Sequence, residues 1–289
     1  MALGQRVLTW FDGRWHEGNA AVIGVADHGA WLGTMVFDGA RAFEGVTPDL
    51  DLHCARIIRS AEVMGLIPPV TAEEIEGLIR EGVRRIGAHV PMYLRPMMWS
   101  RQGTDALIDA DPASTAFAIC LEEYTFRPIA PYALGVSPYR RPAPDAAICE
   151  AKAACHYANN ARVITEARTR GFHNALSLDQ AGNVAETAST NAFLVRDGVV
   201  TTPAPNGTFL DGITRQRVIA LLRADGLEVT ETTLTVEDFA AAEEIFLTGN
   251  AQKITVATRF QDRELGFGPV AARARALYWD YAHQRRSAA

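Results

Sequence analysis

Residues 151–155 read Ala-Lys-Ala-Ala-Cys and directly follow the apolar stretch Ala146-Ala147-Ile148-Cys149. We interpret that stretch as a strand that ends just before Lys152. A lysine at a strand end among small residues would be desolvated, and desolvation favours the neutral amine that attacks carbonyl groups. The alternative is a lysine whose stem lies along the protein while its ammonium reaches water.

Lysine is rare in this chain. Of its 28 basic residues only Lys152 and Lys253 are lysines, and the others are arginines. Arginine stays protonated, whereas a partly buried lysine can lose its proton and form imines. Lys152 is therefore a candidate nucleophile. The alternative is that the two lysines occupy their positions by chance.

The bulk composition argues against several classes of protein. With 289 residues and a formal net charge of −6, the chain offers no basic field for nucleic acid or anionic lipid. No apolar run approaches the roughly 20 residues that span a bilayer, and Met1 to Trp10 lacks the pattern of a signal peptide. Four cysteines without CxxC spacing indicate reduced thiols. We therefore expect a cytoplasmic protein that binds neither nucleic acid nor membrane.

Turn and capping residues predict alternating strands and helices. Asp12-Gly13 and Asp197-Gly198 are typical of hairpin turns, and Thr71 with Glu74 has the spacing of a capping box. The expected elements are a hairpin over 6–16, helices over 54–64, 71–87, 160–170, 214–224 and 269–285, a short helix after Thr235, and buried strands over 91–99 and 114–121.

Five prolines between positions 128 and 144 interrupt this pattern. They would prevent a long helix, so we expect a connector over 122–132 followed by an edge strand. The domains predicted on either side are 1–121 and 133–289. The fold class is therefore α/β or α+β, with two domains.

Two glycine turns could hold a phosphate group. Asp211-Gly212-Ile213-Thr214-Arg215 opens an amphipathic helix whose N-terminus offers N–H groups and a hydroxyl. Leu247-Thr248-Gly249-Asn250-Ala251 ends an apolar strand at a glycine beside a side-chain donor. Many helices begin in this way without a ligand, and the sequence does not show that the two turns converge.

Three further side chains would suit a flat, phosphorylated cofactor. Glu186 lies in a run of small and hydroxylated residues and could keep a ring nitrogen protonated, although a strand glutamate usually faces solvent. Arg56 could bind phosphate oxygens in bidentate fashion, although an exposed helical arginine is commoner. Arg56 follows His53 by three residues, and we expect a strand to meet a helix at this point of the chain. Tyr157 could place a phenol near Lys152, or be an ordinary half-buried tyrosine.

Taken in order, these positions resemble the branched-chain aminotransferase-like family, the fold-type IV pyridoxal-phosphate (PLP) enzymes. The resemblance extends from about Asp12 to Gly268; each piece is unspecific alone, whereas the ordered set is specific. The pieces are Gly33-Thr34-Met35-Val36-Phe37-Asp38-Gly39, His53-Cys54-Ala55-Arg56, Tyr93-Leu94-Arg95-Pro96, Ala151-Lys152-Ala153, Glu186 to Asn191 and Gly212-Ile213-Thr214.

The resemblance implies a role for each matching residue. Lys152 matches the lysine that carries PLP as a Schiff base, Tyr157 the tyrosine at the phenolic oxygen, and Glu186 the acid at the ring nitrogen. The implied phosphate and ring contacts are Arg56, Leu210, Ile213, Thr214 and Asn250, and the implied substrate contacts are Phe37, Gly39, Tyr93, Arg95 and Ala251.

The resemblance also implies an architecture and a reaction. A small N-terminal and a larger C-terminal α/β domain would hold the cofactor between them, in a homodimer or higher oligomer. The expected reaction moves an amino group from an apolar or branched-chain L-amino acid to a 2-oxo acid acceptor, 2-oxoglutarate.

Three departures bear on the substrate. Leu32 stands where branched-chain enzymes commonly have a tyrosine, and Asn250 stands where a threonine or serine usually contacts phosphate, although its amide could still donate. The segment 100–112 lacks the glycine-rich interdomain loop of those enzymes. It contains Arg101, which could bind a carboxylate, as in D-amino acid relatives, or face solvent.

Other reactions on the same scaffold stay open. A 4-amino-4-deoxychorismate lyase would share the lysine, the glutamate and the phosphate site, but Tyr93 and Arg95 count against it. A D-amino acid or (R)-amine transaminase is a further alternative. Phe37, Gly39 and Arg41, together with that pair, favour the branched-chain type over an (R)-amine transaminase. A catalytically silent homologue would have no use for the whole set of matching residues.

Overall fold

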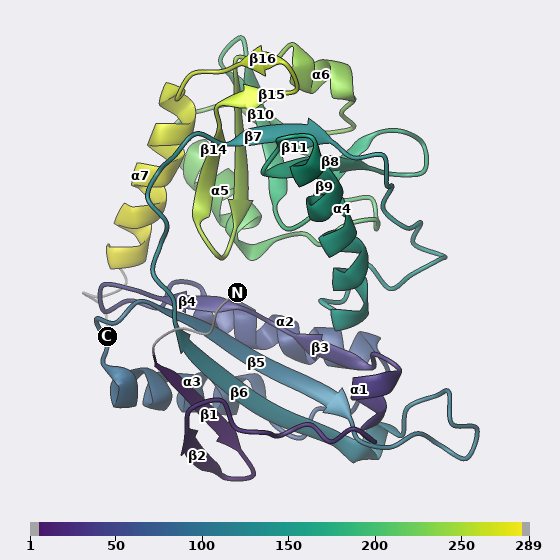
Figure 1. Cartoon of the computed structure of the whole chain (residues 1–289). Coiled ribbons are helices and arrows are strands. Elements are labelled where there is room, and N and C mark those ends of the chain that lie inside the picture. Colours follow the sequence, from purple (N-terminus) through teal and green to yellow (C-terminus); the bar gives the residue numbers. More distant parts are fainter. Residues whose placement is uncertain (1–5, 285–289) are drawn as a thin grey trace. The chain divides into compact units, whose positions relative to one another are not determined.

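The computed structural model describes residues 6–284, and contacts among them divide the chain into two compact units (Figure 1). Among the described residues, the first unit comprises 6–126 together with Glu150–Cys155, and the second comprises Arg127–Cys149 and 156–284. The segment that carries Lys152 thus groups with the first unit, although the chain on both sides of it belongs to the second. The boundaries predicted at 121 and 132 stay predictions, and Arg285-Arg286 lies outside the described residues.

The first unit is built on one antiparallel sheet in the order β2-β1-β6-β5-β3, with β4 also paired to β5. Its β1–β2 hairpin turns at Asp12 and Gly13, whose φ angles are 52° and 77°. A two-residue turn that needs two positive φ angles explains why this pair occurs there, as predicted. The strands are β1 (Val7–Phe11), β2 (Arg14–Glu17), β3 (Met35–Phe37), β4 (Ala40–Ala42), β5 (Met92–Ser100) and β6 (Thr115–Glu123).

Helices pack against this sheet and close its core. The long helices α2 (Leu50–Val63) and α3 (Ala72–Ile86) lie along it, with the short α1 (His28–Trp31) near the end of β5 (Figure 1). The predicted capping box of α3 is present, since Thr71 and Glu74 exchange both hydrogen bonds. Helix α2 begins at Leu50, so the strand expected just before residue 54 was wrong. The left-handed Asp49 starts the helix one turn earlier and brings His53 into it.

The second unit contains two five-stranded sheets. One has the order β16-β15-β7-β8-β9 and the other β12-β11-β10-β13-β14. The first comprises β7 (Ala133–Val136), β8 (Asn174–Leu178), β9 (Val184–Thr187), β15 (Arg259–Phe260) and β16 (Arg263–Glu264); the second comprises β10 (Asn191–Arg196), β11 (Val199–Pro203), β12 (Val229–Thr232), β13 (Glu244–Gly249) and β14 (Lys253–Ala257). The expectation of an edge strand after the connector was wrong, because β7 pairs in parallel with both β8 and β15.

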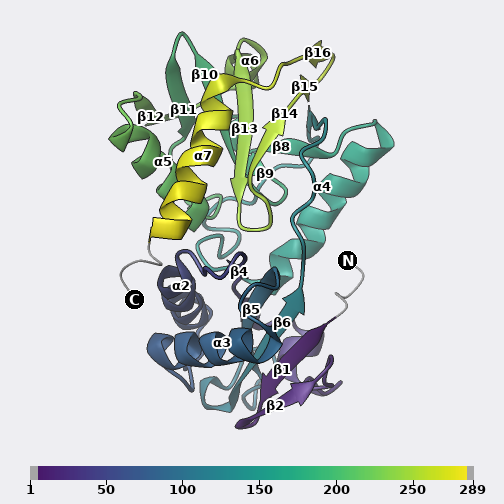
Figure 2. The same cartoon turned by 90° about the vertical axis from the view of Figure 1, so that its left-hand side faces the viewer.

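Two helices of the second unit pack together on the β10–β13 sheet (Figure 2). They are α5 (Ile213–Ala224) and α7 (Pro269–Gln284). Beneath them the rings of Phe193 and Phe246 stack with centroids 4.8 Å apart. The unit also contains α4 (Tyr157–Thr169), which begins three residues before the predicted start, and α6 (Val236–Ala240). Among the helices of residues 6–284, none combines the length and apolarity needed to cross a bilayer.

Candidate active site

Lys152 is held in the first unit by its own backbone. Its N–H donates to the Ser60 hydroxyl at 3.1 Å, and its carbonyl accepts from the Phe37 N–H at 3.2 Å. The preceding residues 146–149 form turns with local hydrogen bonds and no strand, so that prediction was wrong. Two prolines just upstream explain this, because Pro142 and Pro144 carry no N–H for a sheet ladder. The lysine is therefore positioned by β3 and α2 of the same unit.

The Lys152 side chain lies beside a residue predicted for the substrate side. Its Nζ is 4.8 Å from the centroid of the Phe37 ring, and the residue is half-buried. An apolar ring next to the amine reduces its contact with water. The structure thus brings together two candidate residues that lie 115 positions apart in the sequence.

Asp38 organises the candidate phosphate arginine. The carboxylate is fully buried and accepts from Arg56 Nε at 2.7 Å and from Arg56 Nη2 at 2.9 Å. His53 Nδ1 lies 2.7 Å from the same carboxylate, and the Gly39 N–H donates to it at 2.6 Å. Arg56 is therefore a buried, oriented side chain and not the exposed helical arginine of the commoner case. Asp38 was quoted in the sequence motif, but no short-range signal identified it as the partner of Arg56.

The other substrate candidates of the first unit form a second group. A Cβ on Gly39 would overlap the hydroxyl end of the Tyr93 ring, so the glycine is required for the close approach of that ring. Arg95 lies with its guanidinium 5.3 Å from the Tyr93 centroid and pairs with the buried Glu122 at 2.9 Å. This group therefore places an aromatic hydroxyl and an oriented guanidinium side by side on β5.

In the second unit Glu186 is buried on β9 and faces an arginine. Arg141 Nη2 lies 3.5 Å from Glu186 Oε1. The same guanidinium donates to Asn160 Oδ1 and to the Thr208 carbonyl, each at 2.9 Å. Glu186 is thus not a solvent-facing strand glutamate. Sequence reasoning missed Arg141, because it was read only as part of an isolated basic pair and nothing local links it to position 186.

The two glycine turns are connected through Asn191. Its Nδ2 donates to the Leu210 carbonyl at 3.0 Å, and its backbone pairs with Thr248 in the β10–β13 ladder. Gly212 packs so closely against the Asn191 amide oxygen that a Cβ there would overlap it. The convergence that the sequence left open is therefore present, since one asparagine contacts both turns. Ile213 and Thr214 are buried in the first turn of α5.

The β13–β14 turn carries a buried donor that lacks an acceptor. Asn250 Oδ1 accepts from Lys253 Nζ at 2.6 Å, while the buried Asn250 Nδ2 has no hydrogen-bond partner among the described residues. Such a group costs free energy unless something binds to it. The position predicted to contact phosphate therefore presents a donor.

The remaining predicted residues are more exposed. Tyr157 at the start of α4 is 37% exposed, and Ala251 is exposed in the β13–β14 turn. Arg101 is also exposed, with its guanidinium 5.5 Å from the Phe11 ring centroid. None of these three lies in the buried groups described above.

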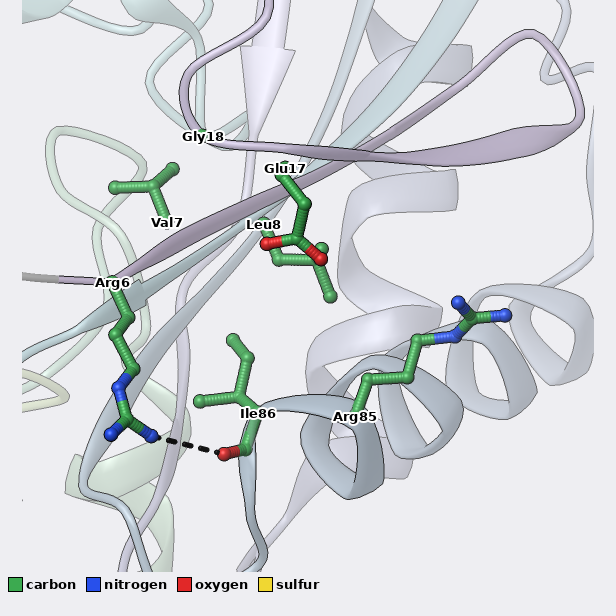
Figure 3. Close-up of a pocket in the computed structure, with 7 residues that line it drawn as sticks. All are labelled: Arg6, Val7, Leu8, Glu17, Gly18, Arg85 and Ile86. Carbon is green, nitrogen blue, oxygen red and sulfur yellow. Dashed lines mark hydrogen bonds between the residues drawn. The ribbon is translucent and has the colours of Figure 1, made fainter.

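Figure 3 shows a hollow of about 320 Å³ in the first unit. An Arg6 to Ile86 carbonyl hydrogen bond of 3.4 Å crosses it. None of the candidate residues lines it; the lining residues are Arg6, Val7, Leu8, Glu17, Gly18, Arg85 and Ile86. Its location separates it from the chemistry of Lys152.

Comparison with known proteins gives consistent matches. A curated probable branched-chain-amino-acid aminotransferase of Rickettsia bellii is 32% identical over 249 residues, covering 85% of this chain and 84% of the relative. A crystal structure of a Brucella abortus aminotransferase bound to PLP is 49% identical with a TM-score of 0.95, covering 96% of this chain and all of the other. A Thermoproteus uzoniensis branched-chain aminotransferase solved with norvaline is 30% identical with a TM-score of 0.88, covering 96% and 95%.

With a lysine amine, a buried carboxylate and two glycine turns on this fold, the chain is a PLP-dependent aminotransferase. The family model for amino-transferase class IV matches residues 35–260, and the chain belongs to that family. The resemblance predicted from the sequence is thereby confirmed. The substrates are an amino acid and a 2-oxo acid.

Proposed function

We propose that this enzyme transfers the amino group of an apolar, branched-chain L-amino acid to 2-oxoglutarate, with Lys152 as the residue that binds PLP covalently. The observation that carries the proposal is the position of the Lys152 amine, 4.8 Å from the centroid of the Phe37 ring. The names of the relatives support a branched-chain substrate, and no relative reported above is named as a lyase.

The residues present fit PLP. Lys152 offers an amine, Glu186 a buried carboxylate for a ring nitrogen, and Asn250 Nδ2 a buried donor for a phosphate oxygen. Gly212 at the start of α5 keeps the backbone close to Asn191, and a helix N-terminus favours anions. We propose that these residues bind the cofactor. The predicted domains 1–121 and 133–289 and the contacts of Tyr157, Leu210, Ile213 and Thr214 belong to this proposal.

Each residue then has a chemical task. When bound, PLP supplies an electron-accepting ring that lets the substrate Cα lose its proton. The Lys152 amine would take that proton from Cα and deliver it to the C4′ carbon of the cofactor. Glu186 holds a proton at the ring nitrogen, and Arg56 binds the phosphate in the orientation that Asp38 imposes. The Phe37 ring excludes water from the amine.

The first unit provides features for the substrate. Arg95 is oriented by Glu122 and Tyr93, and its guanidinium suits the second carboxylate of 2-oxoglutarate. Phe37 and the Gly39–Tyr93 contact leave an apolar surface for a branched side chain. Ala251, in the β13–β14 turn, is a further proposed substrate contact. We further propose a homodimer or higher oligomer, and a cytoplasmic location that the four free cysteines support.

The covalent step can be tested within the chain, because it has only two lysines. The PLP-loaded enzyme would be reduced with borohydride and its peptides mapped by mass. We expect the pyridoxyl group on Lys152 and none on Lys253, which serves as the internal control. Label on Lys253, or a protein that takes up no PLP, would overturn the assignment.

Substrate choice requires a separate test. The PLP absorbance would be followed during half-reactions with L-leucine, D-alanine and (R)-1-phenylethylamine. We expect conversion with L-leucine and not with the other two. If only D-alanine or the amine reacts, the branched-chain L-specificity is wrong. Release of pyruvate from aminodeoxychorismate without an amino acceptor would instead favour a lyase.

A further inference from the structure

The β13–β14 turn gathers buried polar atoms for which the described residues provide no hydrogen-bond partner. These atoms are Thr248 Oγ1, Asn250 Nδ2 and Gln252 Nε2, at alternate positions of a five-residue stretch. In the described part of the second unit only Arg215 Nε shares this condition. A buried donor without a partner destabilises the folded protein, so three such groups on one turn indicate a hydrogen-bonding partner that is not part of the chain.

The orientation of both amides is determined by their neighbours. Asn250 Oδ1 accepts from Lys253 Nζ at 2.6 Å, and Gln252 Oε1 accepts from the Arg127 backbone N–H at 3.1 Å. An ammonium and a backbone N–H only donate, so each must face the oxygen end of its amide. The NH2 ends of both amides are therefore left to donate.

Lys253 adopts a conformation that does not favour lysine. Its φ is 62°, and its side chain is buried at 1% exposure. It follows the three-residue loop from Asn250 to Gln252, at a hairpin position where glycine is usual. A left-handed conformation is unfavourable for a non-glycine residue because of its Cβ. A lysine at such a position, in a chain with only two, indicates that its side chain is used.

We infer that Lys253 is a positioning residue that holds the Asn250 amide so that Nδ2 donates to the phosphate of bound PLP. The inference rests on the proposed function, because it assumes that PLP binds at this turn. Lys253 acts through Asn250, and its ammonium polarises the amide so that the NH2 group becomes a stronger donor. Gln252 Nε2 and Thr248 Oγ1 supply further donors on the same turn.

The test compares two ligands that differ only in the phosphate. Cofactor-free protein would be titrated with PLP and with pyridoxal, and the affinity followed by absorbance. Lys253→Met should weaken PLP binding about 10-fold or more, the loss expected for a hydrogen bond to a charged group, and leave the affinity for pyridoxal unchanged. Lys253→Arg, which keeps a donor, should recover part of the loss.

A second background isolates the route through Asn250. Asn250→Thr supplies a hydroxyl that needs no lysine to orient it, so adding Lys253→Met there should change PLP affinity by less than about 3-fold. Two independent positions would instead show the full loss of about 10-fold in this background. Lys253→Gly relieves the left-handed backbone but should still lose PLP affinity. Gln261→Gly, at another left-handed position (φ 51°), is the matched control and should leave PLP affinity unchanged.

The outcomes separate this inference from the proposed function. If the wild-type protein takes up no PLP, the proposed function fails and this inference with it. A second outcome is that the wild-type protein takes up PLP while Lys253→Met changes the affinities for PLP and pyridoxal equally, or changes neither. In that case the proposed function stands and the positioning role is overturned. An undiminished effect of Lys253→Met in the Asn250→Thr background would also overturn it.

Discussion

Asp38 is the residue on which the orientation of Arg56 depends. Burial alone would raise the pKa of this carboxyl, but the charges of Arg56 and His53 and their hydrogen bonds outweigh it and hold the pKa well below its usual range. The carboxylate is thus anionic in the folded protein and accepts from both side chains. Its neighbours in the sequence are Phe37 and Gly39, so this short segment carries two proposed substrate residues and the partner of the proposed phosphate arginine.

We expect Asp38→Asn to weaken both stability and cofactor binding. Removing the charge leaves Arg56 buried without its anionic partner, which should lower the free energy of unfolding by about 3–5 kcal/mol. PLP affinity should fall as well, because Arg56 is no longer oriented. Urea unfolding and absorbance titration measure the two effects. Asp225→Asn is the matched control, because it removes an exposed carboxylate that pairs with Arg273; an equal loss there would contradict the special role of Asp38.

The same carboxyl predicts a direction of pH dependence. Since its pKa in the folded state lies below the unfolded value of about 3.9, its contribution to stability is fully present above about pH 4 and is lost as the pH falls toward the folded value. Urea unfolding between pH 7 and about pH 3 should show a steeper acid loss in the wild type than in Asp38→Asn. Parallel curves would contradict the prediction.

Gly39→Ala should affect the substrate and spare the cofactor. A Cβ at this position would overlap the Tyr93 hydroxyl, so the ring must move away from Arg95. We expect KM for the amino donor to rise about 10-fold, equivalent to about 1.4 kcal/mol, with an unchanged PLP spectrum. Steady-state kinetics measure it. Gly77→Ala, which has open space around it, should leave KM unchanged; an equal rise there would sink the steric explanation.

At the scale of the element, capping boxes define where two helices begin. Thr71 caps α3 in the first unit, and Thr235 caps α6 in the second; each accepts from the backbone N–H three residues on, and Glu74 or Asp238 returns the second bond. Both boxes are visible in the sequence because all their atoms lie within four residues. They stabilise helix starts and take no part in the chemistry.

Removing one cap should lower stability with little change in activity. Thr71→Ala should reduce the free energy of unfolding by about 1 kcal/mol, the usual cost of a lost N-cap. The matched variant Thr235→Ala should cost less, because α6 has five residues against fifteen in α3. Urea unfolding and kcat/KM measure both variants. A large loss of kcat/KM with unchanged stability would show that the caps act on the site.

At the scale of the whole molecule, the candidate residues divide between the two units. Lys152, Arg56 and the substrate group lie in the first, and Glu186, the α5 turn and the β13–β14 turn in the second. A ligand slows the local opening of every segment that its bound state requires, so bound PLP should slow hydrogen exchange in each segment that contacts it.

Hydrogen exchange should therefore show protection in both units on adding PLP. We expect slower exchange at 150–157 and around α2 in the first unit, and at 210–214 and 248–254 in the second. Mass spectrometry of the cofactor-free and loaded protein measures it, and the surface hollow at Arg6 and Arg85 should not change. Unchanged exchange in any one of these segments would contradict the assignment of its residues to PLP.

Much of the local structure could be predicted from short-range patterns in the sequence. The Asp12-Gly13 and Asp197-Gly198 turns, the Thr71 capping box and the short helix after Thr235 follow from neighbouring residues, and all occur in the structure. The motif order likewise pointed to the family and to Lys152, because the types of residue alone carry that information.

Only the tertiary structure decided which partners meet. Three pairings join parts of the chain that are far apart in the sequence. They are Asp38 with Arg56, Arg141 with Glu186, and β7 with its neighbouring strands inside the sheet. No local pattern encodes such pairs, because they form only where the packing of the folded chain brings distant segments together. The Asn250–Lys253 hydrogen bond was also decided by the three-dimensional structure, although the two residues are close in the sequence. The conformation of the turn, and not the spacing of the two residues, makes the amide face the lysine.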